Sequence, residues 1–153
     1  MILGAKHFLC GLAAIGSLIA PAVPYTHAPD PDEVEMLAII IYQEAGDDGC
    51  CDECRKRVAD VVLNRIADPR YPDTMRGVIT QRAQYGRLYW TGIKWPERAK
   101  NAVEAEAVQR ARDTAWAVLT GDHSELYGAG YVYQSEHKQS DDGMYHCGHW
   151  FCR

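Results

Sequence analysis

The chain has 153 residues, the size of a single domain, and its hydrophobic and charged fractions of 47% and 24% are those of a globular protein. These values exclude a chain that is disordered, collagen-like or coiled-coil throughout. Its 16 Lys and Arg residues against 21 Asp and Glu residues give a net charge of -5, so no basic excess exists to neutralise phosphates and we predict no nucleic acid partner.

Residues 1–22 have the pattern of an export signal. A basic start at Lys6 precedes the uncharged apolar run 8–20, which is short for a membrane-spanning helix, and small residues follow at the expected cleavage point. An uncleaved N-terminal anchor fits the same residues, because glycines make the run only mildly apolar. We therefore predict an exported, monomeric protein of the periplasm or cell envelope, with transient membrane association through this segment, a linker at 23–31 and one domain at 32–153.

Caps, apolar spacing and terminating residues predict the elements of this domain. Asp30 can cap a helix that has Pro31 at its first position and ends at Gly46. The full set comprises helices over 31–45, 55–67 and 95–119, a short helix that includes 75–79, loops or turns over 81–94 and a strand over 126–134. The fold class is therefore α+β and mainly helical, with a small β element late in the chain.

Glu44 is unusual for its position in the first of these helices. Its neighbours three, four and seven residues earlier are Ile41, Ile40 and Leu37, so its carboxyl group faces aliphatic carbon. Burial and the negative end of the helix dipole both favour the protonated form, which a general acid needs to cleave a glycosidic bond. The alternative is a partly solvated structural glutamate that pairs with an arginine such as Arg65.

A series of motifs in a fixed order favours Glu44 as a general acid over a structural glutamate. The series is IYQEAGDD, RVADVVLNRIADPRYPDTMRGVITQRAQY, GYVYQ and HCGHWFC. In this order the motifs resemble the spore cortex-lytic and cell wall hydrolase family over residues 34–153. The family implies a lysozyme-like fold related to lytic transglycosylases, and peptidoglycan as the partner and substrate. Two features depart from the family pattern, namely the Cys-rich segment 50–54 and the lack of a separate peptidoglycan-binding repeat.

The resemblance places the catalytic glutamate of the family at Glu44 and its Gln-Phe pair at Gln84 and Tyr85. Tyr131 and Tyr133 share one face of the predicted strand, and they either line a glycan cleft or cover the core. We therefore predict Glu44 as the catalytic residue, no metal ligand and no cofactor at the site, and substrate contacts from Asn64, Gln84, Tyr85, Tyr131 and Tyr133. Among the tryptophans, we expect Trp116 in the core and Trp90 as the best sugar platform.

The resemblance also implies a mechanism. Glu44 protonates the oxygen between N-acetylmuramic acid and N-acetylglucosamine, and the 6-hydroxyl of the sugar then captures the oxocarbenium-like centre to give a 1,6-anhydro product. Hydrolysis, as in a muramidase-type phage lysis enzyme, instead requires a second carboxylate. Its candidates are Asp47, Asp48, Asp73 and Asp141. A non-catalytic or zinc-stabilised envelope-binding module is the alternative from another class.

Six cysteines stand out in a chain of this length. Cys10 lies in the export segment, so five remain in the predicted mature chain and cannot all pair with one another. Disulfides are the favoured state after export, for example between Cys147 and Cys152. Cys51 and Cys54, together with Cys147 and nearby histidines, also permit a zinc site, although a second complete metal-binding motif is lacking.

Overall fold

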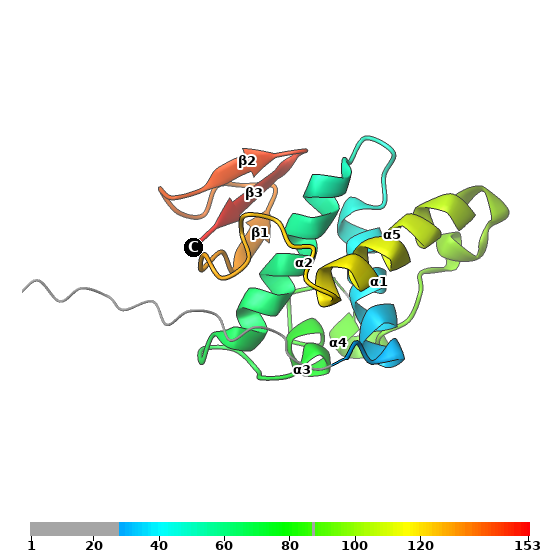
Figure 1. The fold of residues 1–153 in the computed structure, drawn as a ribbon, viewed down its shortest axis with the longest axis horizontal. Helices are drawn as coiled ribbons and strands as arrows, with labels where there is room; N and C mark the ends of the chain where they lie inside the picture. The colour runs from blue at the N-terminus through cyan, green and yellow to red at the C-terminus, as the bar shows by residue number, and fades with distance from the viewer. Residues whose placement is uncertain (1–27, 87) are drawn as a thin grey trace, which may run out of the picture.

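The structure, a computed structural model, describes residues 28–86 and 88–153 (Figure 1). The predicted export segment at 1–22 lies outside these residues, as does the first part of the linker. The elements in chain order are α1 (Pro31–Ala45), α2 (Asp52–Ala67), α3 (Met75–Ile79), α4 (Leu88–Thr91), the 3-10 helices η1 (Glu97–Lys100) and η2 (Ala102–Glu104), α5 (Ala105–Leu119), β1 (Tyr133–Ser135), β2 (Met144–His146) and β3 (His149–Cys152). The predicted α+β, mainly helical fold class is confirmed.

Helix α1 begins and ends where its sequence predicts. The side chain of Asp30 accepts a hydrogen bond from the N–H of Asp32 at 2.9 Å, and Pro31 occupies the first helical position. At the other end, the N–H of Gly46 donates to the carbonyl of Tyr42. A Cβ atom at position 46 would lie only 2.3 Å from that carbonyl oxygen, so glycine is required there. These contacts fix the last turn of α1 in place.

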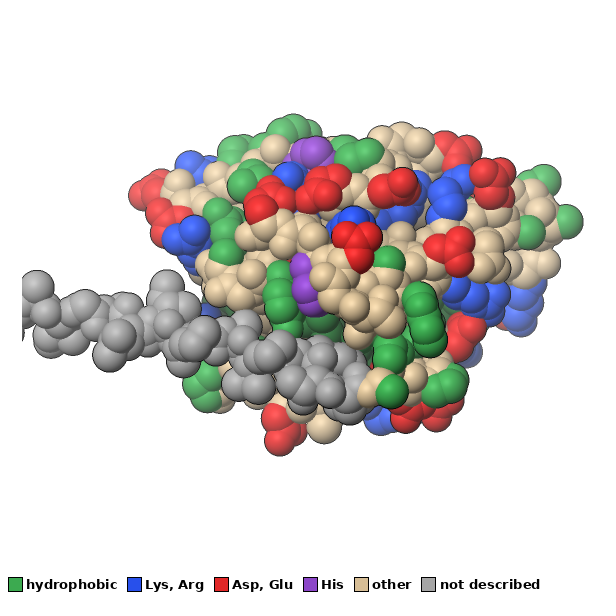
Figure 2. Space-filling model, viewed as in Figure 1, with side chains coloured by type: hydrophobic (Ala, Val, Ile, Leu, Met, Phe, Trp, Pro, Cys, Tyr) green, Lys and Arg blue, Asp and Glu red, His purple; other side chains and the backbone are tan. Residues whose placement is uncertain are grey.

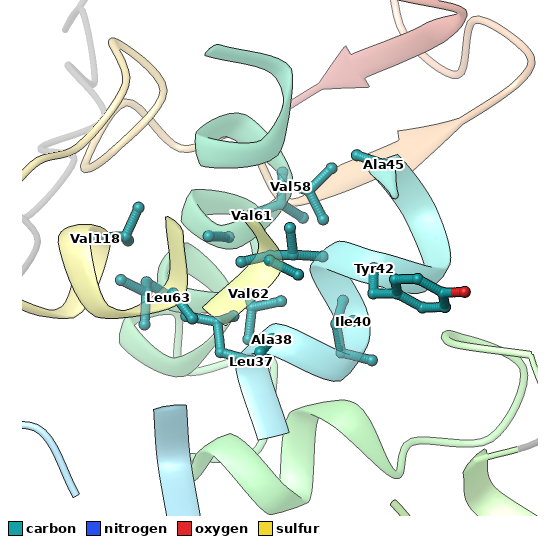
Figure 3. Packing of buried hydrophobic residues seen from close by; sticks show 14 of the residues in the cluster. Leu37, Ala38, Ile40, Tyr42, Ala45, Val58, Val61, Val62, Leu63 and Val118 are labelled. Atoms are coloured by element: carbon teal, nitrogen blue, oxygen red, sulfur yellow. The ribbon is translucent and has the colours of Figure 1, made fainter. Parts of the chain in front are cut away.

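The apolar core surrounds α1, which packs against α2, α3 and α5. Figure 3 shows Leu37 and Ile40 of α1 beside Val58 and Val62 of α2, and all four side chains are completely buried. Full burial of an aliphatic side chain of this size contributes about 1.5–3 kcal/mol. Because α1 is held along most of its length, its C-terminal turn is a rigid support for side chains that face outward.

Helix α2 also buries polar side chains, and these hold the irregular segment 122–132. Asn64 donates to two backbone carbonyls of this segment and accepts from one backbone N–H, at 2.7–2.9 Å. Arg65 donates to another carbonyl at 2.6 Å, and Asp60 accepts from the N–H of Ser124 at 2.7 Å. Side chains of α2, rather than strand pairing, thereby satisfy the hydrogen bonding of the buried backbone groups in this segment.

The strand predicted over 126–134 is wrong in extent, because only Tyr133–Ser135 form β1. Much of the backbone before it is already bonded to side chains of α2 and cannot form a sheet ladder. β1 pairs antiparallel with β3, which pairs antiparallel with β2, in the order β1-β3-β2. The sequence did not predict β2 and β3, since strands of three and four residues are too short to establish an alternating pattern.

The long helix predicted over 95–119 is broken in its first half. Asn101 takes an extended conformation (φ -76°, ψ 137°) between η1 and η2, and α5 begins only at Ala105. Asparagine has a lower helix propensity than the alanines near it in sequence, which favours a break at this position. The expected core position of Trp116 is also wrong, because this side chain is 54% exposed on the outer face of α5.

Helix α2 begins three residues earlier than predicted. Cys51 has the extended conformation of an N-cap residue, and the acidic side chains of Asp52 and Glu53 lie in the first turn. Acidic residues favour the positive end of the helix dipole, so the helix extends back to them. The earlier start places Cys54 inside the first turn of the helix.

The surface carries charges of both signs. Figure 2 shows acidic and basic side chains interspersed over the face in view. Within the described residues, none of the helices is both long and apolar enough to cross a membrane.

Candidate active site

Glu44 lies in the last turn of α1, where the aliphatic residues predicted from its spacing surround it. Leu37, Ile40 and Ile41 are all completely buried, whereas Glu44 itself is half-buried. Burial raises the pKa of the Glu44 carboxyl group, and the positive charge of Arg65 opposes this effect only in part. The carboxyl group is therefore more readily protonated than that of an ordinary glutamate, and one of its oxygens accepts a hydrogen bond from the Gln134 side chain at 3.3 Å.

Glu44 opens into a cavity of about 310 Å³. Three of the predicted substrate-binding residues, Gln84, Tyr85 and Tyr133, line this cavity with it. Arg65 of α2 and Gln134 of β1 complete the wall on the side of the sheet. Residues distant in sequence thus line one cavity with the Glu44 carboxyl group. They are Arg65, Ala83–Tyr85, Tyr133–Ser135 and Gln139.

Three residues that line this cavity carry polar atoms for which the described residues supply no hydrogen-bond partner. These atoms are Nη1 of Arg65, the hydroxyl of Tyr85 and Oε1 of Gln134, all of them shielded from solvent. A buried polar atom without a hydrogen-bond partner lowers the stability of the fold by about 1–3 kcal/mol, so such atoms are uncommon in protein cores. The cavity is therefore bordered by residues whose hydrogen-bonding capacity is not fully used within the described protein.

The loop that carries Gln84 and Tyr85 has an unusual backbone. Ala83 adopts a φ of 62°, in the left-handed region that residues with a Cβ atom rarely occupy. Strained conformations of this kind cluster at functional sites. Sequence reasoning missed this feature, because alanine gives no signal for left-handed backbone. The guanidinium group of Arg65 lies 5.3 Å from the centre of the Tyr85 ring and supports the same loop.

A second cavity of about 490 Å³ also includes Glu44 in its wall. Asp47 and Asp48, two candidates for a second carboxylate, line it, whereas Asp73 and Asp141 are not among its lining residues. An oxygen of Asp48 lies 2.5 Å from a guanidinium nitrogen of Arg110, so this carboxylate is already paired.

Sequence reasoning missed Glu104, which lines the second cavity from η2. Its carboxylate accepts a hydrogen bond from the hydroxyl of Tyr42 at 2.7 Å, and the guanidinium group of Arg98 lies 4.9 Å from the centre of the Tyr42 ring. Glu44 therefore lines both cavities, and it is the one lining residue that the two have in common.

Two of the predicted substrate contacts lie elsewhere. Asn64 and Tyr131 do not line the 310 Å³ cavity. The side-chain amide of Asn64 is buried and occupied by backbone hydrogen bonds, one of them to the carbonyl of Tyr131. Trp90 is 73% exposed and is absent from the residues that line either cavity.

The five described cysteines are all unpaired in the structure. Cys147 does not approach Cys152 to close a terminal loop, and instead its sulfur lies 3.5 Å from that of Cys51. Cys152 is buried in β3, opposite Tyr133 of β1.

Comparison with known proteins identifies the class of enzyme. The family model described as Cell Wall Hydrolase matches residues 51–148, which is more than half of the chain. The chain belongs to the cell wall hydrolase family. It is therefore an enzyme of the cell envelope that acts on peptidoglycan, as the sequence motifs predicted. The matched range begins after Glu44, so the role of Glu44 depends on its own geometry.

The fold is that of a known catalytic domain. The crystal structure of the catalytic domain of the Bacillus cereus SleB protein resembles this chain with a TM-score of 0.53 at 19% sequence identity, over 90% of this chain and 98% of that domain. At this identity the likeness establishes the fold alone. No curated protein matches the sequence.

Proposed function

We propose that this cell wall hydrolase cleaves glycan strands between N-acetylmuramic acid and N-acetylglucosamine as a lytic transglycosylase, with Glu44 as its single acid and base. The observation that supports this most is the position of Glu44 on a rigid helix end, with a raised pKa, in the wall of both cavities. A polymer bound across both cavities would have an internal bond beside the carboxyl group.

The chemistry needs one carboxyl group in two protonation states. Glu44 donates its proton to the bridging oxygen, the bond between that oxygen and the muramic acid C1 breaks, and N-acetylglucosamine leaves with a free 4-hydroxyl group. The 6-hydroxyl of the muramic acid then attacks C1 and returns a proton to Glu44. A raised pKa favours the first step, and the resulting carboxylate is a competent base for the second.

The other residues of the 310 Å³ cavity are assigned to substrate binding. The aromatic rings of Tyr85 and Tyr133 suit the apolar faces of sugars, while Gln84, Gln134 and Arg65 supply polar contacts. Asn64 and Tyr131 are positioning residues, because they hold the segment that leads into β1 rather than line the cavity. Export through residues 1–22 to the periplasm or envelope, with the active domain at 32–153 as a monomer, remains part of the proposal.

Hydrolysis through a second carboxylate is the competing mechanism, because Asp47, Asp48 and Glu104 share a cavity with Glu44. Asp48 is paired with Arg110, and Glu104 accepts a hydrogen bond from Tyr42. Asp47 accepts a hydrogen bond from the backbone N–H of Gly49. All three carboxylates therefore already have partners, which favours the mechanism with one carboxyl group.

The experiment that tests the proposal measures muropeptide release from purified sacculi by Glu44→Gln. General acid–base catalysis contributes about 100–10,000-fold, and we expect a loss of that size with the fold retained. Glu97→Gln is the matched control, since Glu97 is exposed on η1, and it should keep full activity. Unchanged release by Glu44→Gln would refute the role of Glu44, and binding of sacculi without release by the unaltered protein would favour a non-catalytic module.

A further inference from the structure

The start of α2 lies near the turn that joins β2 to β3 (Figure 1). Three side chains with metal-binding atoms, those of Cys51, His146 and Cys147, meet there. Cys51 is the N-cap residue of α2, and Cys54 lies in the first turn. From the sheet, His146 ends β2 and Cys147 follows it in the turn. Segments more than ninety residues apart in sequence are thus brought together by the fold.

The distances within this cluster are short. The Sγ atom of Cys51 lies 3.2 Å from Nε2 of His146 and 3.5 Å from Sγ of Cys147. All three ligand atoms lie within 4.8 Å of one another. Cys54 lies three residues after Cys51 in the first turn of α2, and its buried thiol interacts with those of both Cys50 and Cys147. Its place beside Cys147 makes Cys54 the candidate for a fourth ligand.

These distances match tetrahedral zinc. With bonds of about 2.3 Å to sulfur and about 2.0 Å to nitrogen, two sulfur ligands stand about 3.8 Å apart, and sulfur and nitrogen ligands stand about 3.5 Å apart. The observed separations of 3.5 Å and 3.2 Å are each about 0.3 Å shorter. A shift of a few tenths of an ångström would place a zinc ion between the donors.

The backbone of the turn is shaped to deliver the ligand. Cys147 has a φ of 47° and Gly148 a φ of 84°, so both residues are left-handed. This conformation is rare for a residue with a side chain, and in the structure it coincides with the approach of Cys147 to α2. Cys147 and Gly148 form the two-residue hairpin between the paired His146 and His149, and a turn of this kind requires positive φ at both residues. The unusual feature is therefore a cysteine at a position where asparagine, aspartate or glycine is preferred.

The set of donors favours a metal over a disulfide. A bond between Cys51 and Cys147 would use two sulfurs, but it would give no role to the adjacent imidazole of His146. With Cys54 as the fourth ligand, the three clustered donors form the Cys3His set of structural zinc sites, in which all four positions are filled by protein. Soft thiolate and imidazole ligands also select zinc over calcium or magnesium.

We propose that Cys51, Cys54, His146 and Cys147 bind one structural Zn²⁺ ion. The ion joins the β2–β3 turn to the helical body. Because β3 pairs with β1, the ion also braces the strand that carries Tyr133 and Gln134 into the 310 Å³ cavity. The site is separate from Glu44, and its existence does not depend on the proposed reaction.

The experiment determines the zinc content of the full chain, purified without chelators from a zinc-supplemented culture, by mass spectrometry of the metal. We expect about one zinc ion per chain, as a single closed site holds. Cys51→Ser, Cys54→Ser, His146→Ala and Cys147→Ser should each lower zinc occupancy at least about tenfold at a fixed chelator concentration, and removal of zinc should lower the Tm. Cys50→Ser and His137→Ala are the matched controls, which should retain zinc.

Cobalt substitution keeps the proposal testable if the serine variants do not fold. The unaltered chain loaded with Co²⁺ should show the absorption of a tetrahedral ion with thiolate ligands. An unaltered chain that contains no zinc, or that has lost two hydrogens through a bond between Cys51 and Cys147, would overturn the proposal. Full zinc content in both Cys51→Ser and Cys147→Ser would overturn it as well. If Cys50→Ser lost zinc and Cys54→Ser retained it, the choice of Cys54 as the fourth ligand would be wrong.

Discussion

At the scale of the residue, the environment of Glu44 could be predicted from its helical neighbours. The spacing of Leu37, Ile40 and Ile41 predicted an aliphatic setting, and burial is the largest cause of the raised pKa. The partners across the cavity could not be predicted in the same way. Gln134 lies ninety residues away in sequence, and only the folded chain brings its amide to Glu44.

The raised pKa of Glu44 predicts how stability and activity depend on pH. The folded state binds the proton more tightly than the unfolded chain, so the stability gained from protonation is complete below the ordinary glutamate pKa and is lost as the pH rises through the folded pKa. Glu44→Gln avoids this loss and should be more stable than the unaltered protein at neutral pH by about 1 kcal/mol, although it is inactive. Urea denaturation over a pH series measures the difference, and activity should decline over the same rise in pH.

The control is Glu97→Gln, for which the sign is opposite. The hydrogen bond from Lys100 lowers the pKa of Glu97, so its contribution to stability is lost as the pH falls. A stability gain in Glu44→Gln that stayed constant from acid to neutral pH would contradict the assignment of a raised pKa.

Tyr85 offers a second test at this scale, because its hydroxyl is buried without a protein partner. If the hydroxyl binds the substrate, Tyr85→Phe should lower kcat/KM about 5–10-fold, which corresponds to one hydrogen bond of about 1–1.4 kcal/mol. The variant should be at least as stable as the unaltered protein, since no hydrogen bond of the free enzyme is lost. Steady-state kinetics on soluble glycan fragments and thermal denaturation provide the two readouts. Reduced stability with unchanged kinetics would instead assign Tyr85 to packing.

At the scale of the element, helix α1 was predictable from local signals, whereas the segment 122–132 was not. Asp30, Pro31 and Gly46 mark the ends of α1 through interactions with residues close in sequence. The segment 122–132 has the composition of a strand, but its backbone groups bond to Asn64 and Arg65 of α2. Side-chain hydrogen bonds over such a sequence separation leave no periodic pattern, so the predicted strand was too long.

Asn64 tests this account of the segment. Asn64→Ala removes three buried hydrogen bonds and leaves their backbone partners unsatisfied, so the free energy of unfolding should fall by about 2–4 kcal/mol. Activity should fall with it, because the segment leads into β1. Gln109→Ala is the matched control, since this amide side chain is exposed on α5 and its hydrogen bond to Asp113 is exposed as well, and it should change stability by less than about 0.5 kcal/mol. Equal effects of the two substitutions in urea denaturation would argue against the role of Asn64 in holding the segment 122–132.

At the scale of the whole molecule, the motif order predicted the enzyme class, and the family match and the SleB-like fold agree with it. The sequence did not predict that residues of the site line two cavities. Glu104 lines the second cavity from η2, within a region predicted as continuous helix, and Gln134 lines the first cavity from β1. Of the predicted substrate contacts, those on the 84–85 loop and Tyr133 line the cavity, while Asn64 and Tyr131 support it from behind.

The central claim is that one carboxyl group, that of Glu44, performs both proton transfers. Mass spectrometry of the fragments released from purified sacculi tests it most directly, because anhydro and reducing ends differ by the mass of one water molecule. The account predicts 1,6-anhydro ends on the fragments released by the unaltered protein and no such fragments from Glu44→Gln. Reducing ends throughout, or undiminished release by Glu44→Gln, would contradict it.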